Sequence, residues 1–208
     1  MTELGSVVLG FCAGIAASVA AWWLILVAFT PRLRVSKLNQ LEEPKELSPC
    51  GFRYRVKVQN RLRWHAVSGI ELHARLVVRG LDESRPTSLG SLEIPVGDRS
   101  AFPVLDGRRT RERLGDSERI YTLRIHEVDT SPEPTFPLDV SLKLKDRTAT
   151  IEDLLMLGTD AFIRFSVTAN HGRSGFGRTY SEKYRLADIN RGEFASDSIE
   201  TKIQLKST

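Results

Sequence analysis

Hydrophobic and polar positions divide the chain into two parts. The run from Val7 to Phe29 contains no charged residue, whereas much of the remainder alternates between apolar and charged positions. At about 1.5 Å per residue, a helix over these 23 residues spans roughly 34 Å, enough to cross a hydrocarbon core of about 30 Å. The pattern predicts a transmembrane helix over residues 7–30, preceded by a short tail at residues 1–6.

A cleaved signal peptide and a buried core helix are the alternatives for this run. A signal peptide has a basic start and an apolar core of about 7–15 residues. Here the start carries Glu3 and neither Lys nor Arg, and the apolar core is longer. A core helix would show regularly spaced polar residues, but this run holds only Cys12 and Ser18. We therefore expect an uncleaved, single-pass membrane anchor.

Basic residues gather on the C-terminal flank of the predicted span. Arg32, Arg34 and Lys37 follow it closely, so the positive-inside rule places the N-terminus outside and the large domain in the cytoplasm. We expect these three side chains to lie at the membrane surface, where anionic lipid attracts them. Cys50 is the only cysteine beyond the span, so no disulfide forms within the domain, which agrees with a cytosolic location.

Small residues recur at every fourth position of the span. They are Ser6, Gly10, Gly14 and Ser18, which form one stripe along a helix. In lipid, helices associate where such a stripe lets their backbones approach closely. The stripe predicts a homo-oligomer or pairing with another membrane protein.

The remainder of the chain alternates with a period of two residues. In FRYRVKVQ, from Phe52, apolar and basic or polar positions alternate strictly, and the pattern recurs in SGIELHARLVVR, in LDVSLKL, and near Ile163 and Ile199. Shorter strands are expected near residues 33–37, 92–96, 101–105, 119–126 and 178–186. Many short strands separated by Gly- and Pro-containing turns predict an antiparallel sandwich. We place it at residues 49–208, after a juxtamembrane segment and linker at residues 31–48.

One short segment, TIEDLLMLG, indicates a helix instead. Thr150 can cap its N-terminus, Asp153 lies three residues later, and Gly158 can end the turn.

Five segments follow one another in the order found in a known protein domain. They are FRYRVKVQNR, LRIHEVDTSPEPTF, TIEDLLMLG, AFIRFSVTAN and SEKYRLADINRGEF. Over residues 33–200 the chain resembles the cytoplasmic immunoglobulin-like domain of inward-rectifier potassium channels. The matching residues are Phe52, 55–58, Asn60 and Arg61 in the first strand, His126, Glu127, Asp129, Ser131 and Pro132 at a corner, and Tyr184, Ile189, Gly192 and Phe194 in the terminal segment. The resemblance implies an immunoglobulin-like sandwich. Together with the predicted span, it gives one N-terminal transmembrane helix plus an all-β immunoglobulin-like antiparallel sandwich with one short helix as the expected fold.

The chain departs from those channels where they conduct ions. A potassium channel needs a filter whose carbonyl oxygens replace the water shell of the ion. This chain has one predicted span and no Thr-Val-Gly-Tyr-Gly-like segment, so it is not a potassium-selective channel by itself. The resemblance implies a fold and a membrane-attached, oligomeric arrangement, and fold alone does not establish function.

Catalytic and metal-binding motifs do not emerge from the sequence. The histidines His65, His73, His126 and His171 are scattered without paired ligand spacing, and Cys50 has no cysteine neighbour. The carboxylates form no convincing acid–base pair. We expect neither an enzyme nor a cofactor.

The stretch HGRSGFGR is the strongest candidate for an anion-binding site. Its glycines could expose backbone amides, and Arg173 and Arg178 could add charge. However, the order of its glycines is not that of a phosphate loop, and a strand rather than a helix follows. A hairpin loop between two long strands is the favoured interpretation.

A second basic stretch, GRRTRER, is a further candidate contact for an anion or ligand. It contains Arg108, Arg109, Arg111 and Arg113. The net charge of the chain is only +4, from 30 basic and 26 acidic residues, and no aromatic platform accompanies the arginines, so no nucleic-acid partner is expected. A solvated loop tip is the favoured interpretation.

Two hypotheses of different classes remain. One is a non-enzymatic interaction or sensing module held at the membrane, with lipid and a membrane protein as partners. The other is a membrane effector or a pore-forming or channel-associated subunit in which the domain rearranges associated helices. An outward-facing receptor would require the opposite topology, which the flanking charge disfavours.

Overall fold

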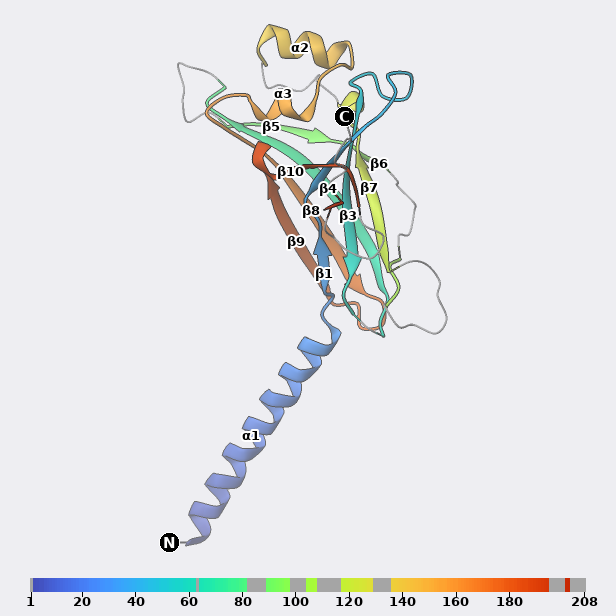
Figure 1. Ribbon diagram of the computed structural model, residues 1–208. Coiled ribbons are helices and arrows are strands. Elements are labelled where there is room, and N and C mark those ends of the chain that lie inside the picture. The colour runs from blue at the N-terminus through green and yellow to red at the C-terminus, as the bar shows by residue number, and fades with distance from the viewer. Residues whose placement is uncertain are drawn as a thin grey trace.

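One long helix leads directly into a β-rich domain (Figure 1). The computed structural model describes residues 2–62, 64–81, 89–97, 104–107, 117–128, 136–194 and 201–202. Helix α1 spans Thr2–Phe29, and its part from Ser6 to Phe29 has a mean hydropathy of 2.1 with none of its most apolar stretch buried against the domain. An exposed apolar N-terminal helix of this length fits a membrane anchor or a signal sequence.

Two sheets make up most of the domain. The strands of the larger sheet are β1 (Leu33–Val35), β2 (Leu38–Glu42), β3 (Phe52–Asn60), β6 (Val96–Gly97), β7 (Glu118–Leu123) and β10 (Ile189–Arg191). The others are β4 (Val67–Arg79), β5 (Leu89–Ile94), β8 (Asp160–His171), β9 (Gly177–Tyr184), β11 (Glu193–Phe194) and β12 (Thr201–Lys202).

The larger sheet has the order β10-β2-β3-β7-β6, and β1 also pairs with β3. The smaller has the order β5-β4-β8-β9, and a separate pair joins β11 to β12. Among the described strands, all pairings are antiparallel except that of β10 with β2.

Alternating side chains from both sheets build a single core. Val56 and Val58 of β3, Leu76 of β4 and Phe165 and Val167 of β8 are all buried in it. These are apolar positions of the period-two pattern, so the prediction of a β-rich, mainly antiparallel domain is confirmed. The outer face of β3 departs from the pattern, since Lys57 is also buried and pairs with Glu118 at 2.7 Å.

The prediction of a strand at LDVSLKL is wrong. Leu138–Lys145 forms helix α2, with Val140 and Leu144 buried and Leu138 and Leu142 exposed. Residues four apart share one face of a helix and also one face of a strand, so alternation over so short a segment fits both. Asp139 in the first turn and Lys143 and Lys145 in the last favour the helix through its dipole.

The predicted helix at TIEDLLMLG is confirmed. Helix α3 spans Ile151–Leu155, and Thr150 and Asp153 form a reciprocal capping box at its start. Gly158 follows the helix with φ of +61°, and a Cβ there would lie 2.1 Å from the carbonyl oxygen of Arg79. Only glycine therefore fits the turn that leads into β8.

Some expected elements differ in extent. Strand β1 lies where a strand was expected near residues 33–37, and β2 also falls within the segment at residues 31–48; both pair with β3. Much of the expected strand at 101–105 lies outside the described residues, although Leu105 bridges to Val67. Ile199, Ile203 and Leu205, of the alternating pattern near the C-terminus, also lie outside them.

Candidate functional site

The end of α1 is attached to two loops at one end of the domain. These are the loop that joins β3 to β4, within residues 61–66, and the β8–β9 hairpin loop at residues 172–176. The Phe29 ring lies edge-on to the ring of His171, with centroids 5.3 Å apart, and 6.1 Å from that of His65. The two imidazoles are 4.9 Å apart. We call these three side chains the junction cluster.

Hydrogen bonds reinforce the junction cluster. Ser174 Oγ donates to the carbonyl oxygen of Phe29 at 3.2 Å, and the Tyr180 hydroxyl donates to that of Pro31. Arg32 donates to the carbonyl oxygen of Val27 at 3.2 Å. A cation near the last carbonyls of a helix is favourable because of the helix dipole. The helix therefore enters the domain through a bonded connection, without a free linker.

His171 is the most constrained titratable group of the junction. Its side chain is buried, and its Nδ1 accepts a hydrogen bond from the backbone N–H of Ser174 at 3.2 Å. Burial, followed by the charges of His65 and Arg173, lowers the pKa of His171 below its ordinary value of 6.5. The geometry favours a neutral imidazole protonated at Nε2, because Nδ1 acts as an acceptor.

The hairpin interpretation of HGRSGFGR is confirmed. Strands β8 and β9 pair up to Asn170 and Gly177, and the loop closes with the backbone N–H of His171 donating to Phe176. Arg173 and Arg178 are exposed there, and the Arg178 guanidinium lies 5.1 Å from the Tyr180 ring centre. The structure thus brings these arginines to the same end of the domain as Arg32.

Arg34 and Lys37 lie progressively further from the helix. Both side chains are exposed, and β1 leads away from α1 beside β3 (Figure 1). At about 3.3 Å per residue, Lys37 lies up to roughly 16 Å along the chain from Arg32. Arg32 is therefore the member of this basic group closest to the helix end.

The small-residue stripe lies exposed along α1. Ser6, Gly10, Gly14 and Ser18 are all exposed, and a Cβ added to either glycine would meet no atom within 4 Å. The stripe is thus an open surface along α1, and the predicted association of helices through it stays a prediction. Arg108, Arg109, Arg111 and Arg113 lie outside the described residues, as do Asp129, Ser131 and Pro132.

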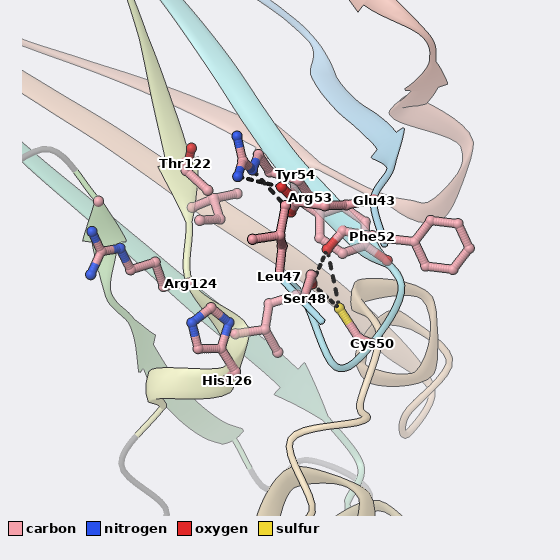
Figure 2. A pocket seen from close by; sticks show the side chains of 13 residues that line it. Glu43, Leu47, Ser48, Cys50, Phe52, Arg53, Tyr54, Thr122, Arg124 and His126 are labelled. Atoms are coloured by element: carbon pink, nitrogen blue, oxygen red, sulfur yellow. Dashed lines mark hydrogen bonds and ion pairs between the residues drawn. The ribbon is translucent and has the colours of Figure 1, made fainter. Parts of the chain in front are cut away.

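A pocket opens at the other end of the larger sheet (Figure 2). It has a volume of about 370 Å³ and lies between the β2–β3 loop, β3 and the segment after β7. Figure 2 shows Arg53, Arg124, His126, Ser48 and Cys50 around it. Because β3 runs from Phe52 in this pocket to Asn60 beside β1, the pocket lies at the end of β3 away from α1.

The charged groups of the pocket are already paired. Arg53 makes a two-pronged contact with Glu43, and Arg124 lies 2.8 Å from Glu127. The Cys50 thiol donates to the carbonyl oxygen of Phe52, and among the described residues no hydrogen bond joins it to His126. Among the described residues of the pocket, no hydrogen bond therefore sets the thiol against a base.

Tyr54 forms the floor of the pocket and connects it to α3. Its buried hydroxyl donates to Glu152 and accepts from the backbone N–H of Ile151 at 3.2 Å. Burial, followed by the hydrogen bond with Glu152, raises the pKa of Tyr54 above its usual range. The group therefore stays protonated and serves structure, fixing α3 against β3.

Sequence comparison adds no assignment to these sites. The chain matches no known protein-family model and no curated protein. Among the described residues, no three His, Cys, Asp or Glu side chains gather where they could hold a metal ion.

Sequence reasoning missed both the junction cluster and the pocket. His65 and His171 were considered only as metal ligands, and their pairing depends on the register that sets Val67 opposite His171. The only sequence signal was that each histidine lies at the end of a strand pattern. The pocket residues come from segments that are distant in sequence, so no local motif marks them.

Proposed function

We propose that the chain is a single-pass membrane protein whose immunoglobulin-like sandwich is a non-enzymatic interaction or sensing module in the cytosol. The observation that carries the proposal is the combination of an unburied apolar helix with a bonded entry into the domain. An unburied helix of this composition needs lipid around it. The bonded entry means that changes in the domain act directly on the helix end.

The resemblance to the inward-rectifier cytoplasmic domain supports this arrangement. The segments FRYRVKVQNR, TIEDLLMLG and AFIRFSVTAN correspond to β3 and Arg61, α3 with its flanks, and β8. Two mainly antiparallel sheets support an immunoglobulin-like sandwich, although the described residues of the domain hold two short α-helices, α2 and α3, where one was expected. Arg32, Arg34 and Lys37 support a cytosolic domain through the positive-inside rule.

Alkaline extraction of membranes tests the anchor. A protein that spans the bilayer stays in the membrane pellet at high pH, whereas one bound only to the surface by charge is released. We expect the full chain to remain in the pellet and to keep its full length. Release of the intact chain, or recovery of a shortened soluble form, would contradict the anchor and favour a cleaved signal sequence.

A membrane effector or pore-forming subunit is the second candidate, and the exposed stripe on α1 favours it. Helices packed through Gly10 and Gly14 could open or disturb the bilayer when the domains rearrange. Dye release from vesicles that contain the protein discriminates the two functions. Release that Gly14→Leu abolishes, and that Ala16→Leu on the opposite helix face does not, would support the effector. Intact vesicles would support the interaction module.

A further inference from the structure

Two exposed aromatic side chains lie at the end of the domain that receives α1. Trp64 is 60% exposed and Phe176 is 42% exposed. Trp64 directly precedes His65, whose ring contacts Phe29, and the carbonyl of Phe176 accepts from the backbone of His171. Both aromatic residues therefore belong to the two loops that hold the helix end.

Arginines lie close in sequence to these aromatic residues. Arg61, Arg173 and Arg178 are exposed, and the Arg61 backbone N–H donates to the carbonyl oxygen of Arg32 at 2.7 Å. Together with Arg32, these arginines and the two aromatic residues place exposed basic and apolar side chains at this end of the domain. We call the set Trp64, Phe176, Arg32, Arg61, Arg173 and Arg178 the basal face.

The position of the basal face is fixed by the helix. Only three residues separate Phe29 at the end of α1 from Leu33 at the start of β1, and the hydrogen bonds at Phe29 and Pro31 tie them to the domain. If α1 spans the bilayer, the domain has no slack with which to move away from it. The basal face then meets the headgroup region.

We propose that the basal face docks on the lipid bilayer beneath it, with Trp64 and Phe176 entering the interface and the arginines contacting anionic headgroups. Tryptophan favours the interface because its ring is apolar and its N–H is polar. Basic side chains close to an anionic surface are attracted to it. The inference rests on the proposed span, and it adds that the domain is held in one orientation on the membrane.

Tryptophan fluorescence in vesicles tests this docking. The chain has three tryptophans, and replacing Trp22 and Trp23 of α1 by Phe leaves Trp64 as the only reporter. Vesicles carry a nitroxide quencher on the headgroup or bromine atoms deep in the acyl chains, in an anionic and in a zwitterionic lipid mixture. We expect the headgroup quencher to remove roughly half or more of the Trp64 emission in anionic vesicles, because the ring lies at headgroup depth.

A tryptophan at the far end of the domain is the matched control. Leu47 lines the distal pocket and is 68% exposed. Leu47→Trp in a chain with Trp22→Phe, Trp23→Phe and Trp64→Phe should keep its emission with either quencher. Arg173→Ala with Arg178→Ala should weaken the quenching of Trp64 in anionic vesicles, whereas Arg75→Ala, on the exposed face of β4, should not.

The fluorescence of the two tryptophans in α1 tests whether this helix spans the bilayer. In a Trp64→Phe chain, Trp22 and Trp23 lie about 10 Å from the end of α1, within the acyl region, so brominated chains should quench them. If they are quenched and Trp64 is not, the docking is wrong and the anchor stands. If Trp22 and Trp23 are not quenched, α1 does not span the bilayer, and the proposed docking of the basal face is wrong as well.

Discussion

The hydroxyl of Ser174 donates a hydrogen bond of 3.2 Å to the carbonyl oxygen of Phe29. This bond joins the β8–β9 loop to the last residue of α1, across 145 positions of sequence. The same hydroxyl lies 3.1 Å from His171 Nδ1. One serine thus connects α1, the hairpin loop and the junction cluster.

Replacing Ser174 by Ala should weaken this connection. The variant leaves the Phe29 carbonyl without its side-chain donor, and we expect the free energy of unfolding to fall by about 1 kcal/mol. Thermal unfolding of the full chain in detergent micelles measures the change. Ser181→Ala is the control, because the hydroxyl of that exposed serine accepts a long hydrogen bond of 3.4 Å from the Ser166 hydroxyl, remote from α1. Equal losses in the two variants would contradict a special role for Ser174.

Acid should destabilise the junction through His171. Because the pKa of His171 in the folded protein lies below its ordinary value of 6.5, the unfolded chain binds the proton more readily. The stability that the neutral His171 contributes to the folded protein is fully present above pH 6.5, and it is lost as the pH falls through the lower pKa of the folded state. A proton on Nδ1 would also displace the Ser174 N–H.

His171→Asn separates this effect from general acid sensitivity. The Asn side-chain oxygen can accept the same N–H but does not titrate. We expect the melting temperature of the unmodified chain to fall further than that of the variant between about pH 7.5 and about pH 5. His73→Asn, at a largely exposed histidine, should leave the acid response of the chain intact. An unchanged acid response in His171→Asn would show that another group is responsible.

The main features of the fold could be predicted because each follows from one local property. The uncharged run to Phe29 predicts a long apolar helix, and alternation in β3, β4 and β8 predicts strands that face a core. The same logic fails at α2, where Val140 and Leu144 satisfy both periods. Burial of Lys57 could not be predicted, because it depends on Glu118 and on Phe194, whose ring centre lies 6.0 Å away.

The candidate sites were harder to predict than the fold. Arg32, Arg173 and Arg178 stood out as basic residues, but only the pairing of β8 with β9 and the bonds to Phe29 and Pro31 bring them together. Trp64 and Phe176 gave no signal, because isolated aromatic residues in loops are common. Their significance comes from their place beside the helix end.

Replacing Gly158 or Gly51 by alanine should lower the free energy of unfolding by different amounts. Both have positive φ, at +61° and +75°, but only Gly158 is crowded, by the Arg79 carbonyl. Gly51→Ala should lower the free energy of unfolding by about 1 kcal/mol from backbone strain alone. Gly158→Ala should cost several times more, because the end of β4 at Arg79 and the turn before β8 must separate. Urea unfolding in micelles compares them, and similar losses would contradict the packing of this turn.

The stripe on α1 predicts a face-specific effect on self-association. Gly14→Leu places a bulky side chain where another helix backbone would approach, so chemical cross-linking in membranes should yield fewer oligomers. Ala16→Leu adds similar bulk about 200° around the helix and should leave cross-linking unchanged. Equal cross-linking in both variants would show that the stripe is not the contact surface.

Thiol labelling shows on which side of the membrane the domain lies. Cys50 is partly buried and hydrogen-bonded, so a reporter at exposed Lys45, as Lys45→Cys with Cys12→Ser and Cys50→Ser, gives a cleaner signal. A membrane-impermeant maleimide is applied to intact and to permeabilised cells, with denatured protein as the control for reactivity. Labelling only after permeabilisation is the result that we predict for a cytosolic domain. Labelling of intact cells would contradict the account and place the domain outside.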